Sequence, residues 1–187
     1  MSVAIDHTGP WTVADVLALP EDRTIRYELL GESLVMSPAP GVRHQRASFR
    51  LHVALDAAAR AVGAPVEILE GVNVVLPSGL VVPDLVVADA GATAEDPATV
   101  DIDAVQLVVE LVSPGNRTMD RKVKPMLYAE AAVPRFWRVE FDPAPMLAVY
   151  ELEGGRYVER ATALAGATTN LDAPFPVAID PAGLTRQ

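Results

Sequence analysis

The chain has 187 residues, half of them hydrophobic, which is enough for one domain with a sizeable core. It has no cysteine, which excludes disulfides, thiolate metal sites and a cysteine nucleophile and fits a reducing cytoplasm, where we expect the protein to act. The formal net charge of −10 argues against non-specific attraction to polyphosphates, although bound divalent ions or a local cluster of the 15 basic residues could offset it.

Residues 1–25 are expected to form a helical lead-in to a single domain that spans residues 1–187. The N-terminus lacks a basic segment followed by an apolar one, and the longest apolar runs are strand-sized. We therefore expect neither a signal peptide nor a membrane span. Thr12 can cap a short helix over residues 12–19, which Pro20 ends.

A hairpin is predicted next. Residues 26–30 and 33–37 have strand composition and are joined by Gly31 and Glu32, a two-residue connection with Gly where a type II′ turn needs it. Glu28 lies in the middle of the first strand, so the pattern places a carboxylate in an apolar setting.

A long helix is predicted over residues 44–62, ended by Gly63. Its arginines are the densest basic cluster of the chain, either an ordinary solvated helix face or a surface for a phosphate backbone. His44 lies near the helix start, where a lone histidine is more often structural than functional. The expected apolar face comprises Ala47, Leu51, Leu55, Ala58 and Val62, and the arginines are Arg43, Arg46, Arg50 and Arg60.

Two aliphatic runs, residues 80–88 and 105–112, have the length and composition of buried strands. Each contains one carboxylate, Asp84 and Glu110, whose lost hydration must be replaced by a partner, a proton or a metal ion. If the strands are neighbours, the carboxylates can converge on Mg²⁺ or Mn²⁺. Alternatively, each carboxylate faces solvent at a strand end or pairs with an arginine.

The segments around these runs complete a mixed sheet flanked by helices, an α/β fold. Strands are predicted over residues 66–70, 72–76, 135–140, 146–151 and 156–160, with an exposed loop over 89–103. A helix is predicted over residues 120–131. Because proline disfavours helical geometry at the preceding residue, its regular part is expected to begin at Pro125, with Lys124 in the turn before it. Residues 165–187 are expected to form a C-terminal surface strap.

Together these pieces resemble the Uma-type endonuclease family, a restriction-endonuclease-like group within the PD-(D/E)XK nuclease superfamily. The resemblance covers about three quarters of the chain in order and spacing, which is more specific than a lone ProAsp dipeptide. The segments that carry it are ArgTyrGluLeuLeuGlyGlu (26–32), SerProAlaProGlyValArgHisGln (37–45), ValProAspLeu (82–85), ValValGluLeuValSerPro (108–114), AspArgLysValLysProMetLeuTyr (120–128) and ValProArgPheTrp (133–137).

The resemblance implies a restriction-endonuclease-like core and a Mg²⁺-dependent phosphodiesterase site, with Mn²⁺ as a substitute ion. Asp84 and Glu110 would bind the metal together with the Leu111 backbone carbonyl. Glu28 would hold a water or a second ion, and His44 matches a histidine that commonly opens the helix.

The site lysine departs from the superfamily pattern. The position two residues after Glu110 is Val112, so the lysine is expected from the following helix, as Lys124 with Lys122 as the substitute. Three further departures leave the proposed ligands intact: Ala132 where the family usually has Gly, Arg135 where Glu is common, and Phe136 where Tyr is common.

The resulting hypothesis is a metal-dependent nuclease acting on nucleic acid, with DNA expected over RNA and a twofold dimer expected because a duplex has two strands to cut. One alternative is a non-catalytic binding or assembly protein that retains the fold, which the acidic composition favours. Another is a metal-free hydrolase with two carboxylates, such as a glycosidase, but a composition of only 5% aromatic residues disfavours it.

Overall fold

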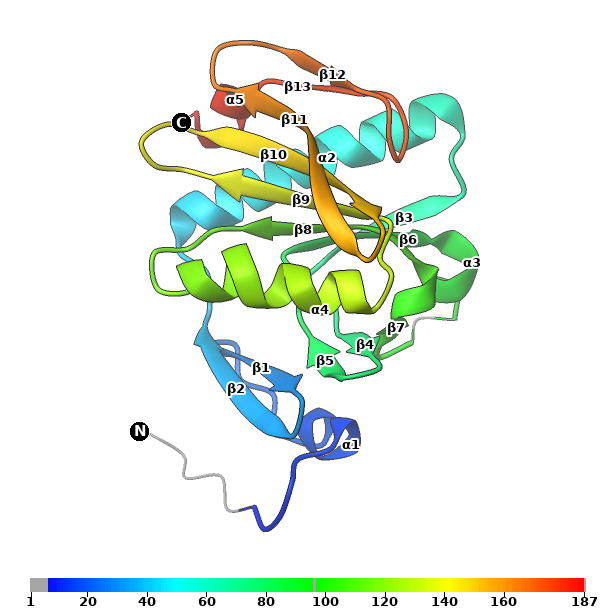
Figure 1. Cartoon of the computed structure of the whole chain (residues 1–187), viewed down its shortest axis with the longest axis vertical. Coiled ribbons are helices and arrows are strands. Elements are labelled where there is room, and N and C mark those ends of the chain that lie inside the picture. Colours follow the sequence, from blue (N-terminus) through cyan, green and yellow to red (C-terminus); the bar gives the residue numbers. More distant parts are fainter. Residues whose placement is uncertain (1–6, 96, 187) are drawn as a thin grey trace.

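The computed structural model describes residues 7–95 and 97–186 and is built around a six-stranded mixed sheet in the order β11-β10-β9-β8-β6-β3 (Figure 1). Strands β8 and β9 run parallel, and the other neighbouring pairs are antiparallel. The strands are β3 (Val66–Glu70), β6 (Leu85–Asp89), β8 (Val105–Leu111), β9 (Arg135–Glu140), β10 (Met146–Glu153) and β11 (Arg156–Leu164).

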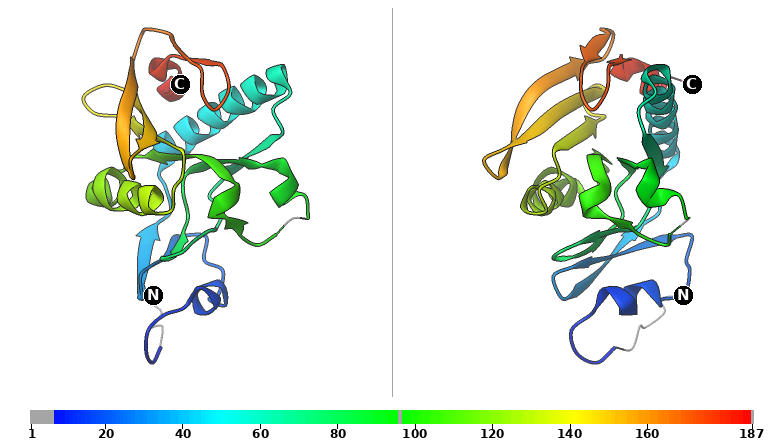
Figure 2. Two further views of the ribbon diagram at one scale, coloured as in Figure 1. Left: turned by 45° about the vertical axis from the view of Figure 1, so that its right-hand side comes forward. Right: turned by 90° about the vertical axis from the view of Figure 1, so that its right-hand side faces the viewer.

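Helices cover both faces of this sheet. Figure 2 (right) shows α2 (Val42–Val62) on one side of the strands and α4 (Lys124–Glu130) on the other. Strand β8 is buried along almost its whole length, which explains why its sequence is a continuous apolar run rather than an alternating one. The expected α/β fold, a central mixed sheet flanked by helices, is confirmed.

A second sheet of five strands, order β2-β1-β5-β4-β7, lies beside the first and was not foreseen (Figure 1). Its strands are β1 (Ile25–Leu30), β2 (Ser33–Pro38), β4 (Val74–Leu76), β5 (Gly79–Val81) and β7 (Val100–Asp101). The predicted hairpin is confirmed as β1 and β2, with Gly31 at a φ of 62° in the connection.

Both ends of the described chain contain short elements. Helix α1 (Val13–Leu17) has Thr12 as its N-cap in a capping box with Asp15; residues 1–6 of the predicted lead-in lie outside the described residues. The segment expected as a surface strap contains β12 (Thr169–Leu171), β13 (Val177–Ile179) and α5 (Pro181–Thr185). Its side chains Leu171, Phe175, Val177, Ile179 and Leu184 are buried in the main core, so it is also part of the packing.

The prediction of one strand over residues 80–88 was wrong. The run divides into β5 and β6, which belong to different sheets, and Asp84 lies at the break between them rather than in the middle of a strand. Pro83 explains the break, because proline has no backbone N–H to donate to a sheet ladder. An apolar run alone does not reveal this division, since both halves are equally buried.

Two helical expectations also need correction. Helix α2 ends at Gly63, at a φ of 65°, as predicted, but Val62 is exposed and Ala59 is buried in its place.

Lys124 is not in a turn before helix α4, as was predicted, but is the first residue of that helix. A π-helical turn, Met119–Val123, leads directly into α4, and the Lys124 N–H donates to the Met119 carbonyl five residues earlier. This wider turn keeps helical geometry at Lys124 despite Pro125.

The segment 89–103 is more structured than the exposed loop that was predicted. It contains α3 (Ala90–Thr93), β7 and a 3₁₀ turn, Ile102–Ala104, and buries Thr93, Val100 and Ile102. Its short elements carry too few apolar residues to show a period.

None of the helices among the described residues is long and apolar enough to cross a membrane.

Helix α4 ends with an alanine in a left-handed conformation. Ala132, at a φ of 58°, is the only described non-glycine residue with positive φ. The Val133 N–H bonds the Tyr128 carbonyl and the Ala132 N–H bonds the Ala129 carbonyl, which is the Schellman pattern that favours glycine at this position.

We predict that Ala132→Gly raises the free energy of unfolding by about 0.5–1 kcal/mol, because the left-handed penalty of about 1–2 kcal/mol exceeds the extra backbone entropy that glycine loses on folding. Urea denaturation measures the change. Ala131→Gly, one residue earlier at a φ of −82°, is the control and should lower stability. Equal effects of the two substitutions would contradict the explanation.

Candidate active site

The two carboxylates converge at neighbouring strands. Leu85 of β6 pairs with Val109 of β8 in an antiparallel ladder, so the next residues in register, Asp84 and Glu110, lie opposite each other. Both line a cavity of about 430 Å³, and they are only 4% and 1% exposed. The alternative in which each carboxylate faces solvent is therefore excluded.

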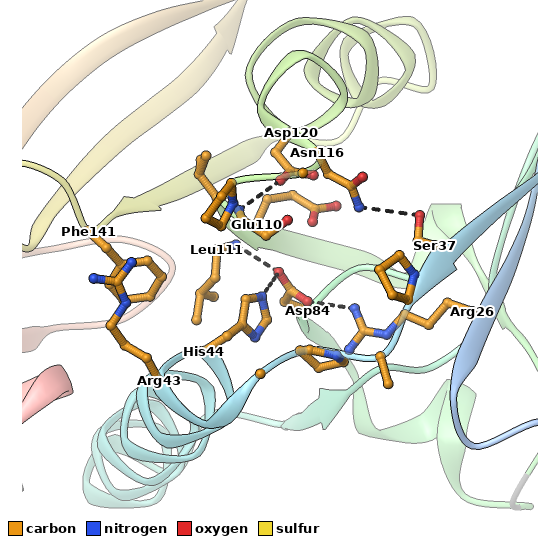
Figure 3. A pocket seen from close by; sticks show the side chains of 18 of the residues that line it. Arg26, Ser37, Arg43, His44, Asp84, Glu110, Leu111, Asn116, Asp120 and Phe141 are labelled. Atoms are coloured by element: carbon orange, nitrogen blue, oxygen red, sulfur yellow. Dashed lines mark hydrogen bonds and ion pairs between the residues drawn. The ribbon is translucent and has the colours of Figure 1, made fainter.

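Asp84 is held from three directions (Figure 3). Arg26 Nη1 donates to Oδ1 at 2.7 Å, while the Leu111 N–H donates to Oδ2 at 2.8 Å and His44 Nε2 lies 3.0 Å from Oδ2. Burial alone would raise the pKa of Asp84, but His44, Arg26 and Lys124 outweigh it and lower the pKa to about 2. Asp84 is thus an ionised carboxylate. The predicted alternative, in which a carboxylate pairs with an arginine, is also correct for Asp84, whose partner is Arg26.

Glu110 has the opposite electrostatic character. Tyr128 Oη donates to its Oε1 at 2.5 Å, and Lys124 Nζ lies 3.1 Å from the same oxygen. Burial raises the pKa of Glu110 to about 8; Lys124 opposes the shift, while the neighbouring carboxylates add to it. Two carboxylates that face one another therefore differ in their readiness to ionise, an arrangement typical of acidic active sites.

Lys124 joins two of the acidic side chains. Its Nζ lies 2.9 Å from Glu28 Oε1 and 3.1 Å from Glu110 Oε1, and the Val82 N–H also donates to Glu28 Oε1 at 2.9 Å. Burial alone would lower the pKa of Lys124, but Glu110 and Glu28 raise it above its ordinary value. The sequence offered Lys124 or Lys122 as the site lysine. In the structure Lys124 lines the cavity, whereas Lys122 is exposed.

His44, on the first turn of α2, lines the cavity. Because Asp84 is ionised and can only accept, Nε2 must carry the proton in their contact. The other ring nitrogen, Nδ1, is buried without a hydrogen-bond partner among the described residues. All five predicted side chains, Glu28, His44, Asp84, Glu110 and Lys124, thus meet at one cavity, and Leu111 contributes its N–H; the ligand role of its carbonyl stays a prediction.

Three further site residues were missed. Arg26 is two residues before Glu28, and therefore on the same face of β1. Asp120 and Tyr128 are four residues before and after Lys124, so helical spacing alone could have placed them beside it. Burial raises the pKa of Asp120 to about 6, although Lys124 and the hydrogen bond from the Ser113 N–H oppose the shift.

The arginines of α2 do not form one continuous basic face. Arg50 donates to the carbonyls of Gly183 and Arg186, and Arg60 pairs with Asp56 on its own helix. Arg43 is different, because it lines the cavity and lies over the Phe141 ring at 4.8 Å (Figure 3). Of Arg43, Arg50 and Arg60, the phosphate-binding interpretation therefore fits Arg43 best.

The two carboxylates Asp84 and Glu110 are the side chains of this cavity that suit a hard divalent cation. No group of three or more His, Cys, Asp or Glu side chains in the described parts of the chain could hold a metal ion. Mg²⁺ does not need such a cage, because it keeps several waters and is often bound by one or two carboxylates together with substrate phosphates. Asp84 and Glu110 beside an open cavity fit that requirement.

The fold and the site define an α/β protein with the architecture of nucleases. The chain belongs to the Uma2 family, described as "Putative restriction endonuclease", which matches residues 13–185. Membership supports a nuclease-like function and confirms the family resemblance seen in the sequence.

A solved structure has a similar fold. A crystal structure from Anabaena variabilis, described as a "putative nuclease belonging to DUF820", superposes with a TM-score of 0.70 at 15% identity. The match covers 88% of this chain and 90% of that chain. At this identity the likeness concerns the fold alone. Comparison with curated proteins gives no match.

We predict that Lys124→Met destabilises the protein by about 3–5 kcal/mol, because it leaves the Glu28 and Glu110 carboxylates buried without their cation. Urea denaturation measures the loss. Lys122→Met removes the same charge from an exposed position two residues away and should change stability by less than about 0.5 kcal/mol. Similar losses in both variants would show that the buried ion pairs do not hold the site together.

Proposed function

We propose that this chain is a divalent-metal-dependent nuclease that hydrolyses phosphodiester bonds of nucleic acid, with DNA as the first substrate to test. The observation that carries the proposal is the cross-strand placement of Asp84 and Glu110 at one cavity beside Lys124. Family membership supplies the reaction class, and the carboxylate pair supplies the donors for an ion.

In this proposal Asp84 and Glu110, with the Leu111 carbonyl, would hold Mg²⁺ or Mn²⁺. When bound, such an ion supplies Lewis-acid stabilisation of phosphate charge and lowers the pKa of a coordinated water. Lys124 acts as a fixed positive charge that orients the attacking water or a phosphate oxygen. Its ammonium is already desolvated and held at two points, so it needs little reorganisation during the reaction.

The remaining side chains would support these groups. Glu28, predicted to hold a water or a second ion, has its Oε1 engaged by Lys124 and the Val82 N–H, which favours a role in fixing the lysine. Arg26 and His44 would fix the Asp84 carboxylate in the orientation it needs.

Two exposed arginines beside the cavity suggest a route for the phosphate backbone of the substrate. Arg43 and Arg117 are about half exposed and both lie near Asp142, at 3.5 and 3.7 Å. Exposed ion pairs of this length are weak, so a phosphate could replace Asp142 as their partner. This local charge would offset the acidic composition of the chain as a whole.

We predict millimolar or tighter Mn²⁺ binding by calorimetry, lost in both Asp84→Ala and Glu110→Ala, because each removes one of the two carboxylate donors. Glu67→Ala, which removes an exposed carboxylate on β3, is the control and should bind as the parent does. Plasmid and RNA cleavage by the same four proteins then tests the reaction and the choice of nucleic acid. Absence of binding, or binding indifferent to both site substitutions, would overturn the catalytic proposal.

The non-catalytic alternative has its own support. Both Asp84 oxygens already have protein partners, as in a purely structural buried carboxylate. Such a protein would show no cleavage with either metal, and a cellular phenotype that survives Glu110→Ala would identify it.

We also propose a homodimer through α2, which forms one outer edge of the molecule in Figure 2 (right). Val42, Phe49 and Val53 are exposed, although apolar, and lie on the face opposite the buried stripe. In an antiparallel twofold pair centred near residue 51, Phe49 of one copy faces Val53 of the other and Arg46 faces Asp56. Such a pair brings exposed apolar side chains of the two copies together and places Arg46 of each copy opposite Asp56 of the other, which also pairs with Arg60 of its own helix.

We predict that the parent protein sediments as a dimer and that Phe49→Glu converts it to a monomer, because the substitution places like charges at the centre of the helix pair. Val62→Glu is the matched control, since Val62 is an exposed valine of the same helix that points away from the face of Phe49 and Val53. Analytical ultracentrifugation measures both variants. A monomeric parent, or dimers in both variants, would refute this interface.

A further inference from the structure

Tyr128 lies on α4, outside the cavity lining, and makes a hydrogen bond to a carboxylate of the site. Its side chain is fully buried, and its hydroxyl donates to Glu110 Oε1 at 2.5 Å. The Lys124 ammonium contacts the same oxygen from one helical turn away. Both of these groups therefore act on Oε1 of Glu110.

Packing fixes the position of this hydroxyl. The Tyr128 ring belongs to the core cluster between α4 and the sheet, and its centroid lies 6.0 Å from that of Phe136 on β9. A ring enclosed in this way leaves the hydroxyl little freedom, so the orientation of the Glu110 carboxylate depends on helix packing.

We propose that Tyr128 is a positioning residue, which holds Oε1 of Glu110 so that Oε2 is presented to a divalent cation in the cavity. The inference rests on the proposed function and extends it, since it assigns the two oxygens of one ligand to different tasks. Outer hydrogen bonds of this kind orient metal-binding carboxylates in proteins generally.

Tyr128→Phe removes the hydroxyl and keeps the ring, so the core contact with Phe136 remains. Without the hydroxyl, Oε1 of Glu110 is held by Lys124 alone, so the carboxylate is less firmly oriented. We expect the dissociation constant for Mn²⁺ to rise about 10-fold to 100-fold. The cleavage rate should fall at low Mn²⁺ and recover as the Mn²⁺ concentration is raised.

The chain contains a matched control for this substitution. Tyr157 is partly buried, its ring centroid lies 5.4 Å from that of Phe136, and its hydroxyl donates to the Val133 carbonyl at 2.9 Å, outside the site. Tyr157→Phe therefore removes one hydroxyl from the same aromatic cluster. Thermal unfolding should show a loss of stability in both variants, while calorimetry with Mn²⁺ should show weakened binding only in Tyr128→Phe.

The outcomes separate this inference from the proposed function. A parent protein that binds no Mn²⁺ overturns both. Mn²⁺ binding by the parent that Tyr128→Phe leaves unchanged, or that both tyrosine variants weaken equally, overturns only the role of Tyr128.

Discussion

The ion pairs of Lys124 with Glu28 and Glu110 connect the two halves of the molecule. Glu28 belongs to the five-stranded sheet, Glu110 to the six-stranded sheet, and Lys124 to the helix that covers the latter. A buried ammonium needs carboxylates, and the carboxylates need the ammonium, so each of the three elements depends on the other two. These buried ion pairs of the site therefore also help to hold the two sheets together.

The site forms where the sheets leave backbone groups without ladder partners. The chain passes from β5 to β6 through Val82, Pro83 and Asp84, and the Val82 N–H donates to Glu28. The Leu111 N–H, at the end of β8, is taken by Asp84. Buried N–H groups require acceptors, and here two site carboxylates supply them. Acidic side chains are thus held in place by the backbone before any ligand arrives.

Much of this was predictable from the sequence, and the limits have physical causes. Asp84 and Glu110 could be found because charge inside an apolar run is costly, whereas Lys124 was chosen over Lys122 through family resemblance rather than spacing. The division between β5 and β6 was hidden because both halves are buried, and Pro83 was its only local signal. Arg26 and Tyr128 escaped notice because their importance lies in tertiary contacts, even though strand and helix spacing already placed them beside Glu28 and Lys124.

The acidic composition of the whole chain does not describe the cavity, because charge at the site is local. Arg26, His44 and Lys124 lie against Asp84, Glu28 and Glu110, so the cavity is not a bare negative surface. An incoming cation would add to the charge compensation of Glu110, whose pKa is raised to about 8 by burial. The difference between a catalytic site and a structural one then depends on the second oxygen of this glutamate, since the first is already held by Tyr128 and Lys124.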